Sequence, residues 1–369
     1  MAHLAELPSL VWRIGMLCFS ICNSSATEPL VQSLLPRGGQ IGSEQRVVIE
    51  GNRLKDATEI IFYSQGIEAR GIEAKNSKVV NATFLISPDT DFGQHELRLR
   101  TPKGLSKLLT FWVGPFPNEN ENEPNSSFEE AQRTSLNCTI NGVIKNEDVD
   151  YFEINATKGQ RISAEIEAIR LSGVMFDPHL AILDESGFEV ASSDDTELLL
   201  QDSTLSILAP RDGLYRIEVR ESSYRGGDKY YYRLHLGSFP RPLVVFPAGG
   251  KKGGTYEFTF LGDPAGTFKR SLTLPESQGV LAYHHSENEL LSPSPNRIRV
   301  SDFASVMEAE PNQNPKEATQ SDSFLPLAFN GVIEKDGDID YFRFNAKKND
   351  RFYILSLIHI SEPTRRAII

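Results

Sequence analysis

Short runs in which apolar and polar residues alternate recur along this chain. In the first third, these runs cover residues 45–51, 59–64, 79–87, 95–101 and 108–114. Further on, they cover residues 150–155, 161–169, 179–187, 203–210, 213–221 and 229–237. A period of two places alternate side chains on one face of a strand. Many short strands separated by Gly, Asn, Asp and Pro turns, with no long amphipathic helical pattern, predict an all-β chain of tandem β-sandwich domains.

Two kinds of internal repeat divide the predicted strands into modules. The first pairs PRGGQIGSEQRVVIEG, residues 36–51, with PAGGKKGGTYEFTFLG, residues 247–262, without a gap. The second pairs ENEPNSSFEEA, residues 121–131, with EAEPNQNPKEA, residues 308–318. It continues from NGVIKNEDVDYFEIN into NGVIEKDGDIDYFRFN with one residue inserted. We therefore predict the module order A (27–116), B (117–238), A′ (240–304) and a truncated B′ (305–354).

The N-terminal segment, residues 1–26, is predicted to be a secretory signal peptide. Arg13 precedes the short apolar run IGMLCFSIC, and Ser24-Ser25-Ala26 supplies the small residues of a cleavage site. The alternative is a membrane anchor, but the apolar run is too short to cross a bilayer. No later segment is apolar enough for a membrane span. These features predict a secreted protein, located outside the cell, at its surface or in the periplasm.

The C-terminal segment, residues 355–369, is interpreted as an artefact. Its sequence LSLIHISEPTR matches the translation of a transposase adapter used in short-read sequencing libraries. The alternative is a native strand and turn. On the adapter interpretation, the native protein continues beyond Ile354, and module B′ is cut short.

Charge and cysteine content narrow the classes of partner and site. The chain has 369 residues and a formal net charge of −12, which argues against a nucleic-acid partner because phosphates would repel it. Cys18 and Cys22 lie in the predicted signal peptide, so only Cys138 stays in the mature chain. Its counterpart in B′ is Leu327, which favours a buried apolar role over a reactive one. An internal disulfide and a cysteine metal site are excluded.

Alternating acidic residues at the start of module B suggest a cation site. In an extended segment Glu121, Glu123 and Asn125 share one side, and Asp148 and Asp150 do the same. If the two segments meet, their carboxylates repel unless a cation neutralises them, and calcium prefers such oxygen ligands. The corresponding residues of B′ are Glu308, Glu310, Asn312, Asp338 and Asp340. The alternative is a solvated acidic linker followed by an aspartate-rich turn.

Signals for catalysis or ligand binding are weaker. His-Glu-x-x-His, Gly-x-Ser-x-Gly and phosphate-binding Gly-Lys-Ser/Thr motifs are absent from the sequence. Tyr230, Tyr231 and Tyr232 form an aromatic run on one strand, but alternation turns Tyr231 away from its neighbours, so at least one of them is expected in the core. The visible region is therefore predicted to be non-catalytic.

Module A resembles the TIG/IPT group of immunoglobulin-like domains. The residues that carry this resemblance are LLPRGGQIGSEQRVVIEGNRL and ATEIIF. Module A′ keeps the first part of the pattern but departs from it after Gly262 and is shorter. The resemblance implies that A and A′ are immunoglobulin-like sandwiches.

Module B resembles the bacterial pre-peptidase C-terminal (PPC) domain. Four motifs occur in the expected order: ENEPNSSFEEA, NGVIKNEDVDYFEIN, HLAILDESGFEVASSDD and APRDGLYRIEVRE. The resemblance implies a jelly-roll-like β-sandwich that accompanies secreted hydrolases, often peptidases, and is not itself catalytic. In the collagen-binding members from clostridial collagenases, the segments equivalent to 121–125 and 148–150 bind calcium.

Together these observations predict a non-catalytic, calcium-stabilised protein of secreted or cell-surface type, whose modules act as spacers or adhesins. Its expected partners are an extracellular protein or a polysaccharide, and the sequence leaves the oligomeric state open. The alternative is the N-terminal accessory region of a secreted hydrolase, such as a peptidase, whose catalytic domain lies beyond the visible end.

Overall fold

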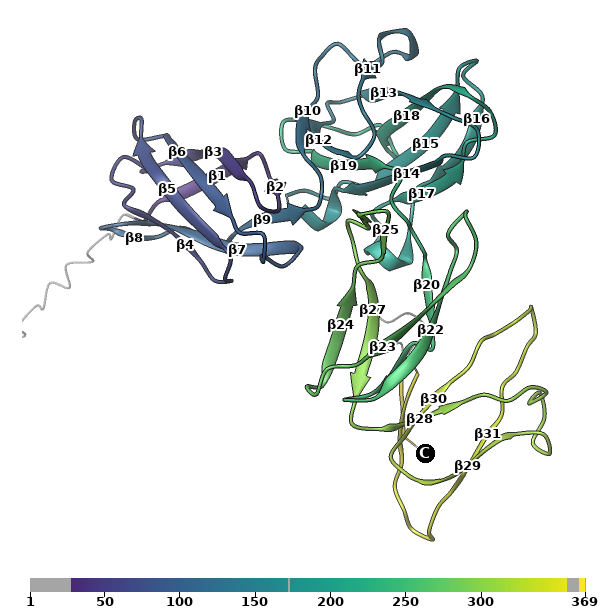
Figure 1. Cartoon of the computed structure of the whole chain (residues 1–369). Helices are drawn as coiled ribbons and strands as arrows, with labels where there is room; N and C mark the ends of the chain where they lie inside the picture. The colour runs from purple at the N-terminus through teal and green to yellow at the C-terminus, as the bar shows by residue number, and fades with distance from the viewer. Residues whose placement is uncertain (1–27, 172, 357–364, 369) are drawn as a thin grey trace, which may run out of the picture.

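The computed structural model describes residues 28–171, 173–356 and 365–368. The predicted signal peptide lies outside these residues, as do residues 357–364 and 369 of the predicted adapter segment. Strands make up 52% of the structure and helices 2%, and the strands form paired sheets along the chain (Figure 1). The prediction of an all-β chain built from tandem sandwiches is confirmed. Among the described residues, no helix is long and apolar enough to span a membrane.

Module A is a two-sheet sandwich. Its strands are β1 (Leu30–Leu35), β2 (Gly38–Gln40), β3 (Glu44–Asn52), β4 (Glu59–Phe62), β5 (Ile67–Ala74), β6 (Val79–Ile86), β7 (Gly93–Thr101), β8 (Gly104–Leu105) and β9 (Leu109–Gly114). One sheet has the order β1-β3-β6-β5, and the other has the order β2-β9-β7-β4. Alternate residues of both sheets, including Ile49, Phe84 and Phe111, are fully buried between them. The period-two pattern therefore marks the inward faces.

Module B consists of two five-stranded sheets. Its strands are β10 (Asn118–Asn120), β11 (Gln132–Arg133), β12 (Cys138–Val143), β13 (Val149–Ala156), β14 (Arg161–Glu167), β15 (Pro178–Asp184), β16 (Glu189–Ser193), β17 (Thr204–Leu208), β18 (Gly213–Glu221) and β19 (Tyr231–Gly237). Single 3-10 turns lie at η1 (Phe128–Glu130), η2 (Ile169–Leu171) and η3 (Glu197–Leu199). We call β10-β12-β19-β14-β17 the front sheet and β11-β13-β18-β15-β16 the back sheet. Cys138 lies in the core between them, where burial raises its thiol pKa to about 11, as expected for an inert apolar position.

Module A′ is a smaller sandwich with three-stranded sheets β20-β22-β23 and β21-β27-β24. Its strands are β20 (Val244–Phe246), β21 (Gly249–Lys251), β22 (Thr255–Leu261), β23 (Phe268–Thr273), β24 (Gly279–Tyr283), β25 (Ser286–Glu287), β26 (Leu290–Leu291) and β27 (Asn296–Ser301). Phe258 and Phe260 form its core with Val245, Leu274 and Ile298. The repeat with module A is visible in the parallel pairing of β21 with β27, which matches that of β2 with β9.

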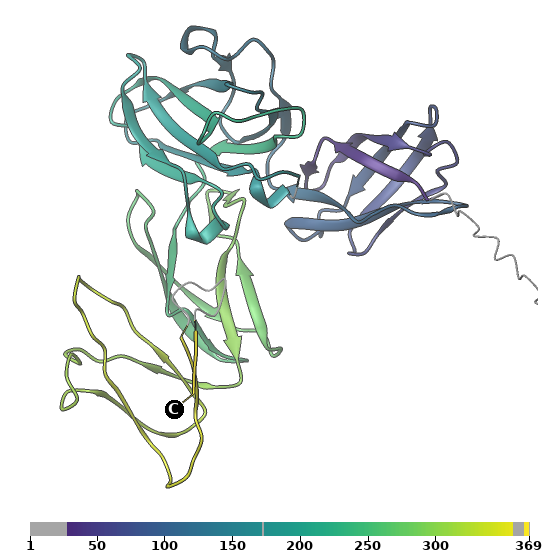
Figure 2. The ribbon, with the colours of Figure 1, turned by 180° about the vertical axis from the view of Figure 1, so that it is seen from behind.

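Module B′ contains only two-stranded sheets in the described residues. Its strands are β28 (Ala304–Met307), β29 (Thr319–Phe324), β30 (Leu327–Asn330), β31 (Phe342–Asn345) and β32 (Tyr353–Ser356), and β32 pairs with β33 (Arg365–Ile368). The described part of B′ contains no fully buried hydrophobic side chain. Figure 2 shows the modules from behind: A and A′ approach B from different sides, and B′ follows A′.

Candidate metal centre

The acidic segment 121–125 crosses from one sheet of module B to the other. Its first residue is held at the front sheet, because the amide of Glu121 donates to the carbonyl of Asn141 at 3.0 Å. Its last residue is held at the back sheet, because the amide of Tyr151 donates to the carbonyl of Asn125 at 2.9 Å. The segment is therefore fixed at both ends beside the start of β13.

The loop before β13 supplies the two aspartates. Asp148 accepts hydrogen bonds from the amide of Lys145 at 3.1 Å and from the hydroxyl of Ser126 at 2.8 Å. These bonds tie the loop to the acidic segment. Asp150 is the second residue of β13 and is fully buried.

Glu123, Asp148 and Asp150 converge, with one carboxylate oxygen of each lying within 4.8 Å of the others. Three buried polar atoms here have no hydrogen-bond partner: Oδ1 of Asp150 and both terminal atoms of the fully buried Asn125 amide. Buried polar groups without partners cost free energy, and they are rare in folded proteins. The geometry thus offers free oxygen ligands to a positive charge.

Glu121 joins this group through the hydroxyl of Tyr232. That hydroxyl lies 2.5 Å from Oδ2 of Asp150 and 3.1 Å from Oε2 of Glu121, while the other Glu121 oxygen accepts from the amide of Val143 at 2.9 Å. One hydroxyl proton cannot serve both carboxylates. Burial, and then repulsion by Glu121, raises the pKa of Asp150 to about 9, and burial raises the pKa of Glu121 to about 7. Without a cation, the pair therefore retains protons near neutral pH.

Gly142 allows the Tyr232 hydroxyl to lie next to the Glu121 carboxylate. A Cβ atom at this position would lie 2.2 Å from Cζ of Tyr232 and 2.3 Å from Oε2 of Glu121. The tyrosine ring is fully buried and cannot move aside. Only glycine allows Tyr232 and Glu121 to meet over β12.

Module B′ has a related cluster, in which the counterpart of Glu121 takes the place of the counterpart of Asp148. Glu308, Glu310 and Asp340 each place one carboxylate oxygen within 4.8 Å of the others. The amide of Val332 donates to Glu308 at 2.7 Å, as that of Val143 does to Glu121. A Cβ atom at Gly331 would lie 2.5 Å from Oε2 of Glu308.

The amide of Asn312 is the informative group in B′. It is fully buried, and one of its two terminal atoms lies 3.0 Å from a Glu310 oxygen and 3.2 Å from an Asp340 oxygen. With nitrogen at this place, the amide donates to both carboxylates. With oxygen there, three oxygens converge, which is favourable only around a cation. The carboxylate and amide oxygens of both copies fit a hard cation such as calcium.

The structure brings together most of the ten residues selected from the sequence. In B, Glu123, Asp148 and Asp150 form the cluster, with Glu121 beside Asp150 and Asn125 buried next to it. In B′, Glu308, Glu310, Asn312 and Asp340 meet, whereas Asp338 caps its own turn by accepting from the amide of Glu334 at 2.8 Å. Metal binding by these residues stays a prediction.

Sequence reasoning did not assign Tyr232 or Gly142 to the site. The tyrosine is 82 residues from Asp150 and belongs to a three-tyrosine run in which no local signal selects one member. Gly142 was detectable, since Asn-Gly-Val-Ile occurs in both copies directly before the aspartate loop.

Comparisons with known proteins agree with the interpretation of module B. A probable subtilase-type serine protease of Deinococcus radiodurans is 34% identical over 102 residues, which cover 26% of this chain and 14% of that protein. The similarity thus concerns a small part of the relative.

The solved structures that match this chain have low sequence identity to it and low TM-scores. One is SGBP-B from a Bacteroides ovatus mixed-linkage glucan utilization locus, with 10% identity, coverage of 53% of this chain and 75% of the other, and a TM-score of 0.22. Another is the Escherichia coli adhesin FdeC, with 10% identity, coverage of 75% and 98%, and a TM-score of 0.20. Similarity at this level carries no functional argument.

The family comparison is specific to module B. Residues 148–221 match the family model of the bacterial pre-peptidase C-terminal domain. The TIG/IPT resemblance of module A stays a prediction. The chain therefore contains a bacterial pre-peptidase C-terminal domain, and its matched residues begin at Asp148 of the candidate metal centre.

Proposed function

We propose that these modules form a non-catalytic, calcium-stabilised region of a secreted or cell-surface protein, which acts as a spacer and binds an extracellular protein or polysaccharide. Calcium would be held by Glu121, Glu123, Asn125, Asp148 and Asp150 in B, and by Glu308, Glu310, Asn312 and Asp340 in B′. The ion would neutralise the negative charges of these carboxylates, and it would hold the acidic segment against the sandwich.

The observation that carries this proposal is the buried Asp150 carboxylate. Its Oδ1 atom has no hydrogen-bond partner, and it lies in a cluster with Glu123 and Asp148. A cluster of three carboxylates recurs in B′, where Glu310 and Asp340 correspond to Glu123 and Asp150 but Glu308 stands in place of the second aspartate. The recurrence supports a built site, because a solvated acidic linker has no reason to gather its carboxylates in both copies. An ion at this place ties β13 to the segment that enters the module.

Calcium titration of the full chain tests the proposal. At a hundredfold excess over the dissociation constant, calcium adds about 2.7 kcal/mol of stability, which raises the melting temperature by roughly 5–10 °C. Asp150→Asn should abolish most of this shift, because it removes a charged ligand. The matched control, Asp195→Asn, removes an exposed carboxylate of the same module and should keep the shift. Equal melting with calcium and with chelator would exclude the site.

A second candidate is the accessory region of a secreted hydrolase. The similarity to a protein named as a subtilase-type serine protease favours it. Sequencing the gene in full separates the candidates, since a catalytic domain encoded after residue 354 would support the hydrolase and further sandwiches would support the spacer. Binding of the full chain to collagen-like peptides, cell walls and glycans tests adhesion directly, and failure with all three would remove it.

A further inference from the structure

The outer face of the front sheet of module B is polar but buried. Along β14 and β19, the residues that point away from the core include Glu165, Glu167, Arg233 and His235, and each is at most 3% exposed. In a two-layer sandwich such a face normally meets water. Here neighbouring modules cover it from two sides.

Module A covers one part of this face. A Cβ atom at Gly38 would lie 2.5 Å from Cζ of Arg233, and one at Gly114 would lie 3.3 Å from Cε1 of His235. The two glycines lie on the paired strands β2 and β9, so the backbone of A rests directly on these side chains. Arg233 is held beneath them by Glu167, with Nη1 and Oε2 2.7 Å apart.

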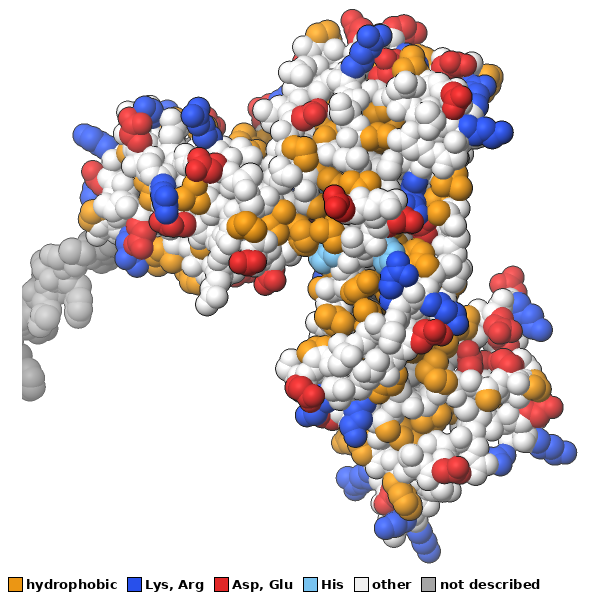
Figure 3. Space-filling model, in the orientation of Figure 1, with side chains coloured by type: hydrophobic (Ala, Val, Ile, Leu, Met, Phe, Trp, Pro, Cys, Tyr) orange, Lys and Arg blue, Asp and Glu red, His pale blue; other side chains and the backbone are white. Residues whose placement is uncertain are grey.

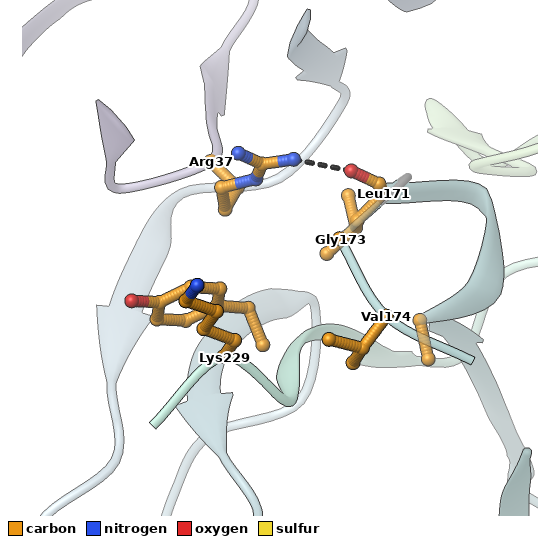
Figure 4. A pocket seen from close by; sticks show the side chains of 7 residues that line it. Arg37, Leu171, Gly173, Val174 and Lys229 are labelled. Carbon is orange, nitrogen blue, oxygen red and sulfur yellow. Dashed lines mark hydrogen bonds between the residues drawn. The ribbon is translucent and has the colours of Figure 1, made fainter. Parts of the chain in front are cut away.

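The turn η2 of module B holds A from a second direction. Arg37 of A donates a hydrogen bond to the carbonyl of Leu171 (Figure 4). The guanidinium of Arg170 lies 5.8 Å from the ring centre of Trp112. The gap left beside Arg37, with Val174 and Lys229 on its wall, has a volume of only about 10 Å³, which is room for little more than one water molecule. The seam between A and B is therefore closely packed.

Module A′ covers the other part of the face. Arg241, which is 1% exposed, places Nε 2.9 Å from a Glu165 oxygen and donates from Nη1 to the carbonyl of Ser294 at 2.9 Å. Arg161 of β14 pairs with the buried Asp263 of A′ at 2.9 Å. The strand β14 thus contributes to both interfaces of B. Glu167 lies under A, whereas Glu165 and Arg161 contact A′.

Modules A and A′ also touch each other. The ring of Phe92 in A lies 4.9 Å from that of His284 in A′. Phe116 and Phe239, from the segments that connect B to A and to A′, have ring centres 5.5 Å apart. Figure 3 shows hydrophobic side chains and histidine gathered at this corner.

We infer that A, B and A′ form one rigid bent unit, with the front sheet of B as its hub. Rotation of A′ would part Glu165 from Arg241 and Asp263 from Arg161, and breaking a buried ion pair is strongly unfavourable. Rotation of A would break the hydrogen bond from Arg37 to the Leu171 carbonyl and lift the backbone of Gly38 off Arg233. The bend between A and A′ is therefore a fixed property of the chain. This inference does not depend on calcium or on a ligand, and it gives the proposed spacer a defined direction.

Distance measurements between spin labels on the full chain test the inference. Labels at Tyr63→Cys in A and Val280→Cys in A′ use exposed positions. Cys18→Ser, Cys22→Ser and Cys138→Leu remove the three native thiols. We expect a single narrow distance distribution that does not change with calcium. A broad or multimodal distribution in this otherwise unchanged chain would overturn the inference, whatever the calcium titration gives.

A variant of the hub then identifies what holds the unit. Glu165→Gln, which keeps the side-chain shape but removes the charge facing Arg241 and Arg170, should broaden the distribution. The matched control is Lys252→Ala, which breaks an exposed ion pair with Asp302 in A′ and should leave the distribution narrow. Equal broadening in both variants would contradict the role of the buried network.

Discussion

Modules B and B′ carry the same acidic motif in very different surroundings. Ile144 of B is fully buried, whereas its counterpart Ile333 is 65% exposed; likewise, Asp150 is fully buried and Asp340 only partly. Nevertheless, both copies bring three carboxylates within 4.8 Å of one another. The geometry of the cluster is therefore local, set by the extended acidic segment and the adjoining turn, and it does not need a complete core.

Burial of the cluster depends on strands that are distant in the sequence. In B, Tyr232 on β19 closes over Asp150 and Glu121, and burial raises the pKa of both carboxyl groups to about 9 and about 7. In B′, burial also raises the pKa of Asp340 and Glu308, but they are far less enclosed. The comparison shows that two properties have different origins. The acidic motif is sufficient to bring the carboxylates together, whereas their burial and the resulting rise in pKa require the complete sandwich.

The largest expected contrast is in local stability. Amides of β18 and β19 in B should exchange hydrogen at least about 10³-fold more slowly than those of β30 and β31 in B′, because only B has a buried apolar core. Hydrogen exchange with mass spectrometry on the full chain measures this, and β27 of A′ serves as an internal reference. Similar protection in the two modules would show that B′ is stabilised without such a core.

The sequence predicted the strands and most of the metal cluster because both depend on local patterns. Period-two alternation located most core strands of A and B, though not β1, and the repeated Glu-x-Glu-Pro-Asn motif located the carboxylates. Nor did it indicate β5, an edge strand in which half of the side chains are exposed. Nor did it indicate the burial of Glu167 and Arg233, since polar residues alternating with apolar ones on a strand are expected to face water. Their burial follows from the packing of A and A′ on B, which no local pattern encodes.

A matched pair of glycine variants tests how far the surroundings differ. Gly142→Ala should destabilise the chain by about 2–4 kcal/mol, because the new methyl group meets the immobile ring of Tyr232. Gly331→Ala should change stability by less than about 1 kcal/mol, because its nearest neighbours are the ends of Glu308 and Asp340, which can move. Urea unfolding followed by fluorescence measures both. Equal losses would mean that the B′ cluster is as rigid as that of B.

The last contrast is a pH dependence that B has and B′ largely lacks. In chelator, folded Asp150 and Glu121 hold protons up to pH values of about 9 and 7, whereas the unfolded chain releases them near pH 4. Folding therefore binds protons in this window, and the free energy of unfolding falls as pH rises from 5 to 8.

Calcium and two variants test whether the slope of unfolding free energy against pH arises from the carboxylate cluster of B. Saturating calcium should remove the slope, because the ion favours the deprotonated carboxylates. Asp150→Asn should flatten it in chelator, since the amide does not titrate, whereas Asp340→Asn should leave it nearly unchanged because Asp340 is only partly buried. Thermal unfolding at several pH values measures all three. A slope that survives in Asp150→Asn would assign the proton uptake to other groups, and the strain would then not be a property of this site.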